Sequence, residues 1–195
     1  MGNIVDTNLD TITYDSKGRL AKWVAGGTTT TMYYNALGQR VKKIVSGSTS
    51  GVYSEFYDPE GRLIGVYTPN GNGGWDVIEE LLYLDGFRVV ATVRPDAVLG
   101  MASPRIFPIL TDHLGSPRTI VDQTGAPQWE WTGYEAFGNQ APNELLGSAR
   151  FVYDGRFAGQ RFDESTSSLH NGFRTYNLKL GRYMQSDPLG LEAGW

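Results

Sequence analysis

The sequence predicts an all-β fold of short antiparallel strands and hairpins. Glycine accounts for 25 of the 195 residues and is interspersed with 5 Trp, 11 Tyr and 8 Phe, a combination typical of many tight turns between short strands. Runs of β-branched and aromatic residues, such as residues 28–33 and 62–67, favour extended backbone. Convincing helical periodicity is found nowhere, and residues 76–82 are ambiguous only because the run is so short.

One pattern recurs in the first third of the chain: Tyr, then Asp or Asn, two variable residues, Gly, and Arg or Gln. The copies are residues 14–19, 34–39 and 57–62. Their tyrosines are 20 and 23 residues apart, and a period near twenty indicates a repeat architecture. The Asp or Asn side chain can cap a turn that Gly closes at positive φ. We therefore expect positive φ at Gly18, Gly38 and Gly61.

The middle of the chain continues this pattern less regularly. Residues 80–93 predict a hairpin around Asp85-Gly86, and residues 70–74 predict a flexible glycine-rich turn. The three prolines of residues 94–108 predict a loop or an edge crossing. Trp129 and Trp131 are two residues apart on one predicted strand, so their side chains should lie on the same side of the sheet.

Composition excludes several functional classes. The chain has no cysteine, so disulfides, thiolate metal sites and a Cys nucleophile are excluded. The net charge of −4 gives no broad footprint for nucleic acid, and residues 40–43, the longest basic cluster, are interpreted as the solvent face of a strand. The chain shows neither an export signal nor an apolar run long enough for a membrane anchor.

Asp112 and His113 have two possible interpretations, a metal or acid–base pair and an ordinary turn. The turn is favoured, with Asp112 as its cap, His113 packed and Gly115 reversing the chain. The only other histidine is His170, and no metal-ligand spacing is present. We therefore expect neither a metal nor a cofactor.

The recurring Tyr-Asp/Asn-x-x-Gly-Arg/Gln pattern resembles the YD repeat of Rhs proteins, Tc-toxin C components and teneurins. Residues 111–118 and 129–138 are similar to two further signatures of that family, Asp-His-Leu-Gly-Ser and Tyr-x-x-Phe-Gly. The resemblance implies a curved, spiralling sheet that forms a segment of a β-cocoon shell. It divides the chain into a YD-repeat shell segment, residues 1–110, and an Rhs core-associated segment, residues 111–195, continuous with the same sheet.

Three charged residues near the C-terminus are the candidates for chemistry: Asp163, Arg174 and Asp187. Two carboxylates that share a proton can activate water against a peptide bond, and an arginine can stabilise an oxyanion. From the residues alone, turn caps and a surface ion pair are the favoured interpretation.

The family resemblance changes this weighting for two of the three residues. Rhs-type cores resemble aspartic proteases in using two Asp-Pro-x-Gly aspartates and an upstream arginine to cut their own chain. Residues 187–190 match the first of these motifs, which makes Asp187 a catalytic candidate, and Arg174 matches the arginine. Thr175 and Asn177 depart from the family pattern, and Asp163 is expected to be structural.

Two functional classes follow from the resemblance. The first is the C-terminal part of a shell that encapsulates a polymorphic toxin and releases it by aspartic autoproteolysis. The second is an extracellular YD-repeat module that binds a carbohydrate or a protein. We expect the parent protein to continue beyond both ends of this chain. We expect no self-cleavage by the 195 residues alone, because they contain only the first of the two C-terminal Asp-Pro-x-Gly motifs of an Rhs-type core; the same four-residue pattern at residues 58–61 belongs to a YD repeat.

The partners implied are the remaining shell and a C-terminal toxin domain of the parent, together with a secretion apparatus or an immunity protein. Neither nucleic acid nor a membrane anchor is expected for this segment. The expected location is outside the producing bacterial cell, after secretion or delivery.

Overall fold

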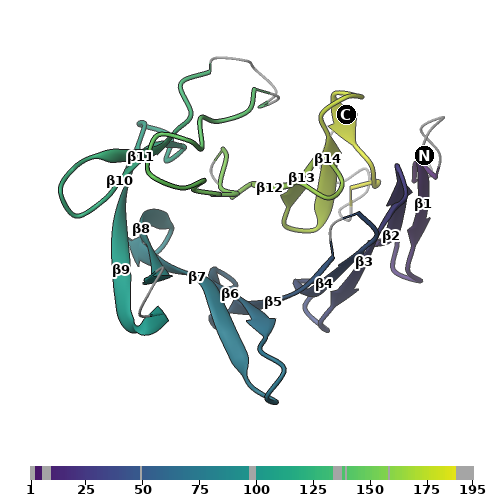
Figure 1. Cartoon of the computed structure of the whole chain (residues 1–195). Coiled ribbons are helices and arrows are strands. Elements are labelled where there is room, and N and C mark those ends of the chain that lie inside the picture. The colour runs from purple at the N-terminus through teal and green to yellow at the C-terminus, as the bar shows by residue number, and fades with distance from the viewer. Residues whose placement is uncertain are drawn as a thin grey trace. The chain divides into compact units, whose positions relative to one another are not determined.

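The computed structural model describes residues 3–5, 10–48, 50–96, 100–133, 138, 140–157 and 159–187 (Figure 1). Strands are the only long regular elements in these ranges, and each pairs antiparallel with its neighbour in sequence within the units described below. The predicted all-β class is therefore confirmed. No helix in the described ranges is long and apolar enough to cross a membrane.

The chain divides into two compact units, and the first combines residues 1–52 with residues 160–195. Its strands are β1 (Thr11–Tyr14), β2 (Leu20–Ala25), β3 (Thr28–Tyr34), β4 (Arg40–Ser46), β12 (Arg161–Asp163), β13 (Ser168–Asn171), β14 (Arg174–Asn177) and β15 (Arg182–Tyr183). Strands β12–β15 form a separate four-stranded sheet. The core of this unit contains Trp23 and Met32 from the first strands and Met184 from the C-terminal segment, so apolar contacts hold the two ends of the chain together.

The second unit comprises residues 53–159. Its strands are β5 (Gly51–Tyr57), most of which lies in this unit, β6 (Leu63–Pro69), β7 (Trp75–Leu84), β8 (Arg88–Asp96), β9 (Gly100–Thr111), β10 (Pro117–Val121) and β11 (Pro127–Glu130). Trp129 and Trp131 are both fully buried in its core, as expected for one side of a strand. Tyr153 packs edge-on against Trp129, with ring centres 5.6 Å apart.

One turn recurs at the ends of the hairpins. Its first residue, Asp or Asn, donates its backbone N–H to the carbonyl of the fifth residue, and its side-chain oxygen accepts the fifth residue's N–H. The turns are residues 15–19, 35–39, 58–62, 70–74, 112–116 and 122–126. Gly18, Gly38 and Gly61 have φ of 75°, 84° and 86°, which confirms the positive φ predicted for them.

The arginine that ends the motif reaches the next repeat. In the first unit, the Arg19 guanidinium lies 4.7 Å from the centre of the Tyr34 ring and donates a hydrogen bond to the Asn35 carbonyl. The Tyr34 hydroxyl donates in return to the carbonyl of Leu20, at 2.8 Å. A cation–π contact and two hydrogen bonds therefore join successive repeats.

The same contact recurs in the second unit. Arg62 lies over the Tyr83 ring at 5.5 Å and donates to the Gly86 carbonyl, while the Tyr83 hydroxyl donates to the Leu63 carbonyl at 2.8 Å. This recurrence explains why the motif contains both Tyr and Arg, since the Tyr ring of one repeat contacts the Arg guanidinium of the repeat before it.

Two sequence-based expectations are wrong in detail. Residues 94–96 and 100–108 are not a loop, because Pro95 lies in β8 and Pro104 and Pro108 lie in β9. Strand β10 pairs with β9 at Ile109 to Thr111, so Pro104 and Pro108 lie where β9 runs beyond β10 and a missing N–H is tolerated. His113 is exposed and not packed, although Asp112 caps its turn as expected.

Gly125 offers a test of the turn that is free of side-chain crowding. Its φ is 86°, and no described atom lies within 4 Å of the position a Cβ would take. Replacing Gly125 with Ala should therefore lower the free energy of unfolding by about 1–2 kcal/mol from backbone strain alone. Asn tolerates this conformation better, so Gly125→Asn should lose less. Urea denaturation compares the three proteins, and an alanine variant as stable as wild type would contradict the assignment.

Candidate functional site

Arg174 and Asp187 form an ion pair at the end of the described chain. Arg174 is the first residue of β14, and Asp187 follows β15 by four residues. The Arg174 Nη1 atom lies 2.7 Å from Asp187 Oδ2, and the two side chains are 29% and 28% exposed. Both side chains are therefore partly accessible to solvent.

An aromatic side chain fixes the position of the arginine. The Arg174 guanidinium carbon lies 3.9 Å from the centre of the Tyr183 ring. Asn171 Nδ2 donates to the Tyr183 hydroxyl at 2.7 Å, and Tyr176 packs edge-on against the Tyr183 ring. Because the ring is held from two directions, the cation above it is held as well.

The backbone leading to Asp187 is paired on both flanks. On one side, Met184 donates its N–H to the Thr175 carbonyl, and the Gln185 side chain accepts the Thr175 N–H. On the other side, Ile4 donates its N–H to the Met184 carbonyl. Residues 184–186 are therefore anchored between β14 and the N-terminal segment, which sets the position of the carboxylate that follows.

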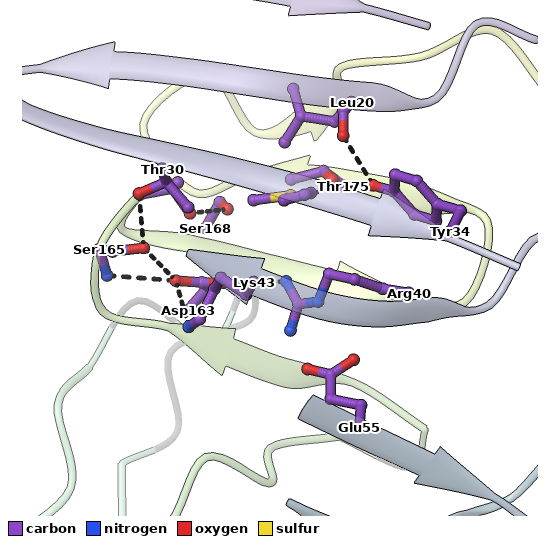
Figure 2. Close-up of polar contacts among 12 residues, drawn as sticks. Leu20, Thr30, Tyr34, Arg40, Lys43, Glu55, Asp163, Ser165, Ser168 and Thr175 are labelled. Atoms are coloured by element: carbon purple, nitrogen blue, oxygen red, sulfur yellow. Dashed lines mark hydrogen bonds and ion pairs between the residues drawn. The ribbon is translucent and has the colours of Figure 1, made fainter. Parts of the chain in front are cut away.

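Asp163 belongs to a different cluster, at the end of β12. Its carboxylate lies 2.9 Å from Arg40 Nη1 and 3.0 Å from Lys43 Nζ, both on β4. The Ser165 hydroxyl donates to Asp163 at 2.6 Å and accepts a hydrogen bond from Thr30 on β3. Figure 2 shows this chain of contacts from β3 through Ser165 to Asp163, with Lys43 beside the carboxylate.

This cluster corrects the interpretation of residues 40–43 as a solvent-facing strand surface. Arg40 is 4% exposed, and the Lys43 side chain is 13% exposed. Two cations can be buried in this way because one buried carboxylate lies between them. No local pattern around residues 40–43 indicates this burial, since the carboxylate is more than one hundred residues away.

The environment of Asp163 keeps it charged. Burial opposes ionisation, but the positive charges of Lys43 and Arg40 and the Ser165 hydroxyl outweigh it and hold the pKa of Asp163 well below its ordinary value. A carboxylate held so firmly in its ionised form is suited to structure and not to proton transfer.

The structure thus sorts the three sequence candidates into two sites. It brings Arg174 and Asp187 together and gives Asp163 its own pair of cations. Residues 188–191, the remainder of the motif that begins at Asp187, lie outside the described residues. Sequence reasoning did not identify Tyr183 as a site residue. Its position could have indicated it, because Tyr183 follows the turn glycine Gly181 by two residues and lies opposite Tyr176 on β14.

The fold agrees with the comparisons to known proteins. A family model described as "Teneurin YD-shell" matches residues 96–193, half of the chain. The chain belongs to the YD-shell family. This membership confirms the resemblance drawn from the repeats, and the sequence signatures within the matched region include residues 111–118.

Toxins are among the relatives of this YD shell. "Double-stranded DNA deaminase toxin A" of Burkholderia cenocepacia (strain H111) is 31% identical over 93% of the chain, and "Toxin protein Tse5" of Pseudomonas aeruginosa is 34% identical over 50% of the chain. The chain spans 14% of the first protein and 7% of the second.

Solved structures show the same fold at lower identity. The TcdB2-TccC3-Cdc42 crystal structure matches 96% of the chain with a TM-score of 0.69 and 16% identity. The Photorhabdus luminescens Tc holotoxin pore matches 94% with a TM-score of 0.62 and 17% identity. The chain covers 9% of each matched structure's chain.

Replacing Asp163 with Asn tests its structural role. The change removes the negative charge that lies between the buried Arg40 and Lys43, so the free energy of unfolding should fall by about 3–5 kcal/mol. Asp122→Asn is the matched control, because that carboxylate also caps a turn but is only partly buried, and its loss should be clearly smaller. Equal losses in a denaturation experiment would show that the ion cluster is not what makes Asp163 important.

The same variant gives a pH prediction. Because the pKa of Asp163 is lowered on folding, the stabilisation is complete above the unfolded pKa of about 3.9 and is lost as pH falls towards the folded pKa. The stability difference between wild type and Asp163→Asn should therefore be constant from pH 7 to about 5 and shrink below about pH 4. A difference that already disappears near pH 6 would contradict this.

Proposed function

We propose that this chain is part of a YD shell that encloses a toxin segment of the same parent protein, and that Arg174 and Asp187 belong to the site where the parent cleaves itself. Family membership supports the shell, and relatives named as toxins support the cargo. The observation that carries the catalytic part is the 2.7 Å ion pair between Arg174 and Asp187.

The chemistry needs two carboxylates. One carboxylate takes a proton from water as the oxygen attacks the peptide carbonyl, and a second, protonated one donates to the leaving nitrogen. The peptide bond breaks into a carboxylate and an amine. In this proposal Asp187 is one of the two, and a second Asp-Pro-x-Gly aspartate in the parent protein is the other.

Arg174 has a position suited to two tasks. Its ion pair holds the Asp187 carboxylate in position, and its further N–H groups can donate to the oxyanion that forms on the carbonyl. Tyr183 is a positioning residue in this scheme, because it contacts the guanidinium and not the reacting atoms. The exposure of the pair leaves room for the second carboxylate and the chain to be cut.

The remaining parts of the proposal concern partners and location. The toxin segment and the rest of the shell are the expected intramolecular partners, and a secretion apparatus or an immunity protein is an expected external one. Delivery out of a bacterial cell fits the relatives, two of which are named as bacterial toxins.

An extracellular binding module is the second candidate. One observation favours it: Phe56 on β5 and Trp75 on β7 are about half exposed and contact each other across the intervening strand β6. A binding surface and a toxin shell are compatible in one protein, so this candidate does not compete with the site at Asp187.

Self-cleavage is tested on the parent chain, extended beyond residue 195 through a second Asp-Pro-x-Gly motif. The wild type should give two fragments on a gel, and Asp187→Asn should give none while its circular dichroism spectrum is unchanged. Arg174→Ala should slow cleavage about 100-fold, the usual cost of losing one oxyanion donor. Tyr183→Phe should retain most of the rate and Tyr183→Leu should not, because the ring holds the arginine.

Asp76→Asn is the matched control, since Asp76 is an exposed aspartate on β7 in the other unit. It should cleave as wild type does. Two fragments from Asp187→Asn would show that Asp187 is not catalytic. If cleavage is lost in a folded Asp163→Asn protein and retained in Asp187→Asn, the catalytic aspartate is Asp163 and not Asp187.

A further inference from the structure

Three aromatic side chains form an exposed patch on β5, β6 and β7 of the second unit. The Phe56 and Tyr67 ring centres are 5.0 Å apart, and those of Phe56 and Trp75 are 6.4 Å apart, both edge-to-face. Phe56 is 47% exposed and Trp75 is 50% exposed. Large aromatic side chains that cluster and remain in contact with water typically mark a binding surface.

The sheet is shaped to hold this patch. Gly65 has no side chain, and the Tyr67 ring lies over it, so that a Cβ at Gly65 would come within 2.7 Å of Tyr67 Cε2. The Tyr67 hydroxyl donates to Glu80 Oε1 on β7 at 2.7 Å. Burial, followed by that carboxylate, raises the pKa of Tyr67 to about 12, so the hydroxyl stays protonated and keeps its donor role.

The charge of the surrounding unit determines which partner fits. Residues 53–159 contain fourteen Asp and Glu, seven Arg and no Lys, a formal charge of −7. The rest of the chain contains seven acidic and ten basic residues, a formal charge of +3. Ion pairs within the unit already engage the arginines Arg62, Arg94, Arg118 and Arg150.

We propose that the patch of Phe56, Tyr67, Trp75 and Glu80 binds lysine or arginine side chains of an extended, basic peptide segment. A cation is attracted to the faces of aromatic rings, to the Glu80 carboxylate and to the negative field of the unit. A neutral saccharide could stack on the same rings but gains nothing from that charge. The patch uses none of the residues proposed for self-cleavage, so it stands or fails independently of them.

The test uses the 195-residue chain and a ten-residue peptide of alternating Lys and Ser, titrated by calorimetry at 50 mM salt. Trp75→Ala and Glu80→Gln should each weaken binding at least about tenfold. The same peptide with acetylated lysines should not bind, and affinity should fall as salt rises to 500 mM, because exposed charges are then screened. Phe87→Ala is the matched control, since Phe87 is another exposed aromatic residue of the same acidic unit, and it should bind like wild type.

Three results would overturn the proposal. Binding that Trp75→Ala leaves unchanged would show attraction to the acidic unit as a whole. Equal losses in Phe87→Ala and Trp75→Ala would show that no particular patch is involved. Trp75-dependent binding of a neutral oligosaccharide, without binding of the lysine peptide, would assign the surface to a carbohydrate instead.

Discussion

The glycine-closed turn is the constraint on which the strands of both units depend. Each copy fixes the register of a hairpin, because one Asp or Asn side chain and one backbone N–H bind the same fifth residue. The register then places the arginine of one repeat over the tyrosine of the next, as Arg19 lies over Tyr34 and Arg62 over Tyr83. Repetition of the same short turn therefore produces the same contact between successive repeats.

The C-terminal sheet depends on a second, non-repeating interaction. Asp163 ties β12 to β4 through Arg40 and Lys43, and Met184 packs in the core built by β1–β3. These contacts hold β14 and the segment that ends at Asp187, so the ion pair with Arg174 inherits its geometry from a buried charge cluster in the same unit. Stability and the proposed chemistry are therefore carried by different aspartates.

Sequence reasoning succeeded where the determinants are local. The all-β class and the turns at Gly18, Gly38 and Gly61 depend on residues within one repeat or one short segment. It failed where a distant partner decides the outcome. Residues 40–43 looked like a solvent face because their anion, Asp163, lies in another sheet. The prolines of β9 predicted a loop because the sequence does not show where β10 ends. Strand β10 pairs only with Ile109 to Thr111, so the part of β9 that contains the prolines is unpaired on that side.

The central claim is that the Asp163 cluster holds β14 in place and thereby fixes Arg174 beside Asp187. Amide hydrogen exchange, followed by mass spectrometry at pH 7 in wild type and Asp163→Asn, tests it directly. The account predicts that residues 174–177 and 184–186 lose protection in the variant, while β6 and β7 in the other unit keep theirs. Unchanged protection of residues 174–177 in Asp163→Asn would contradict it.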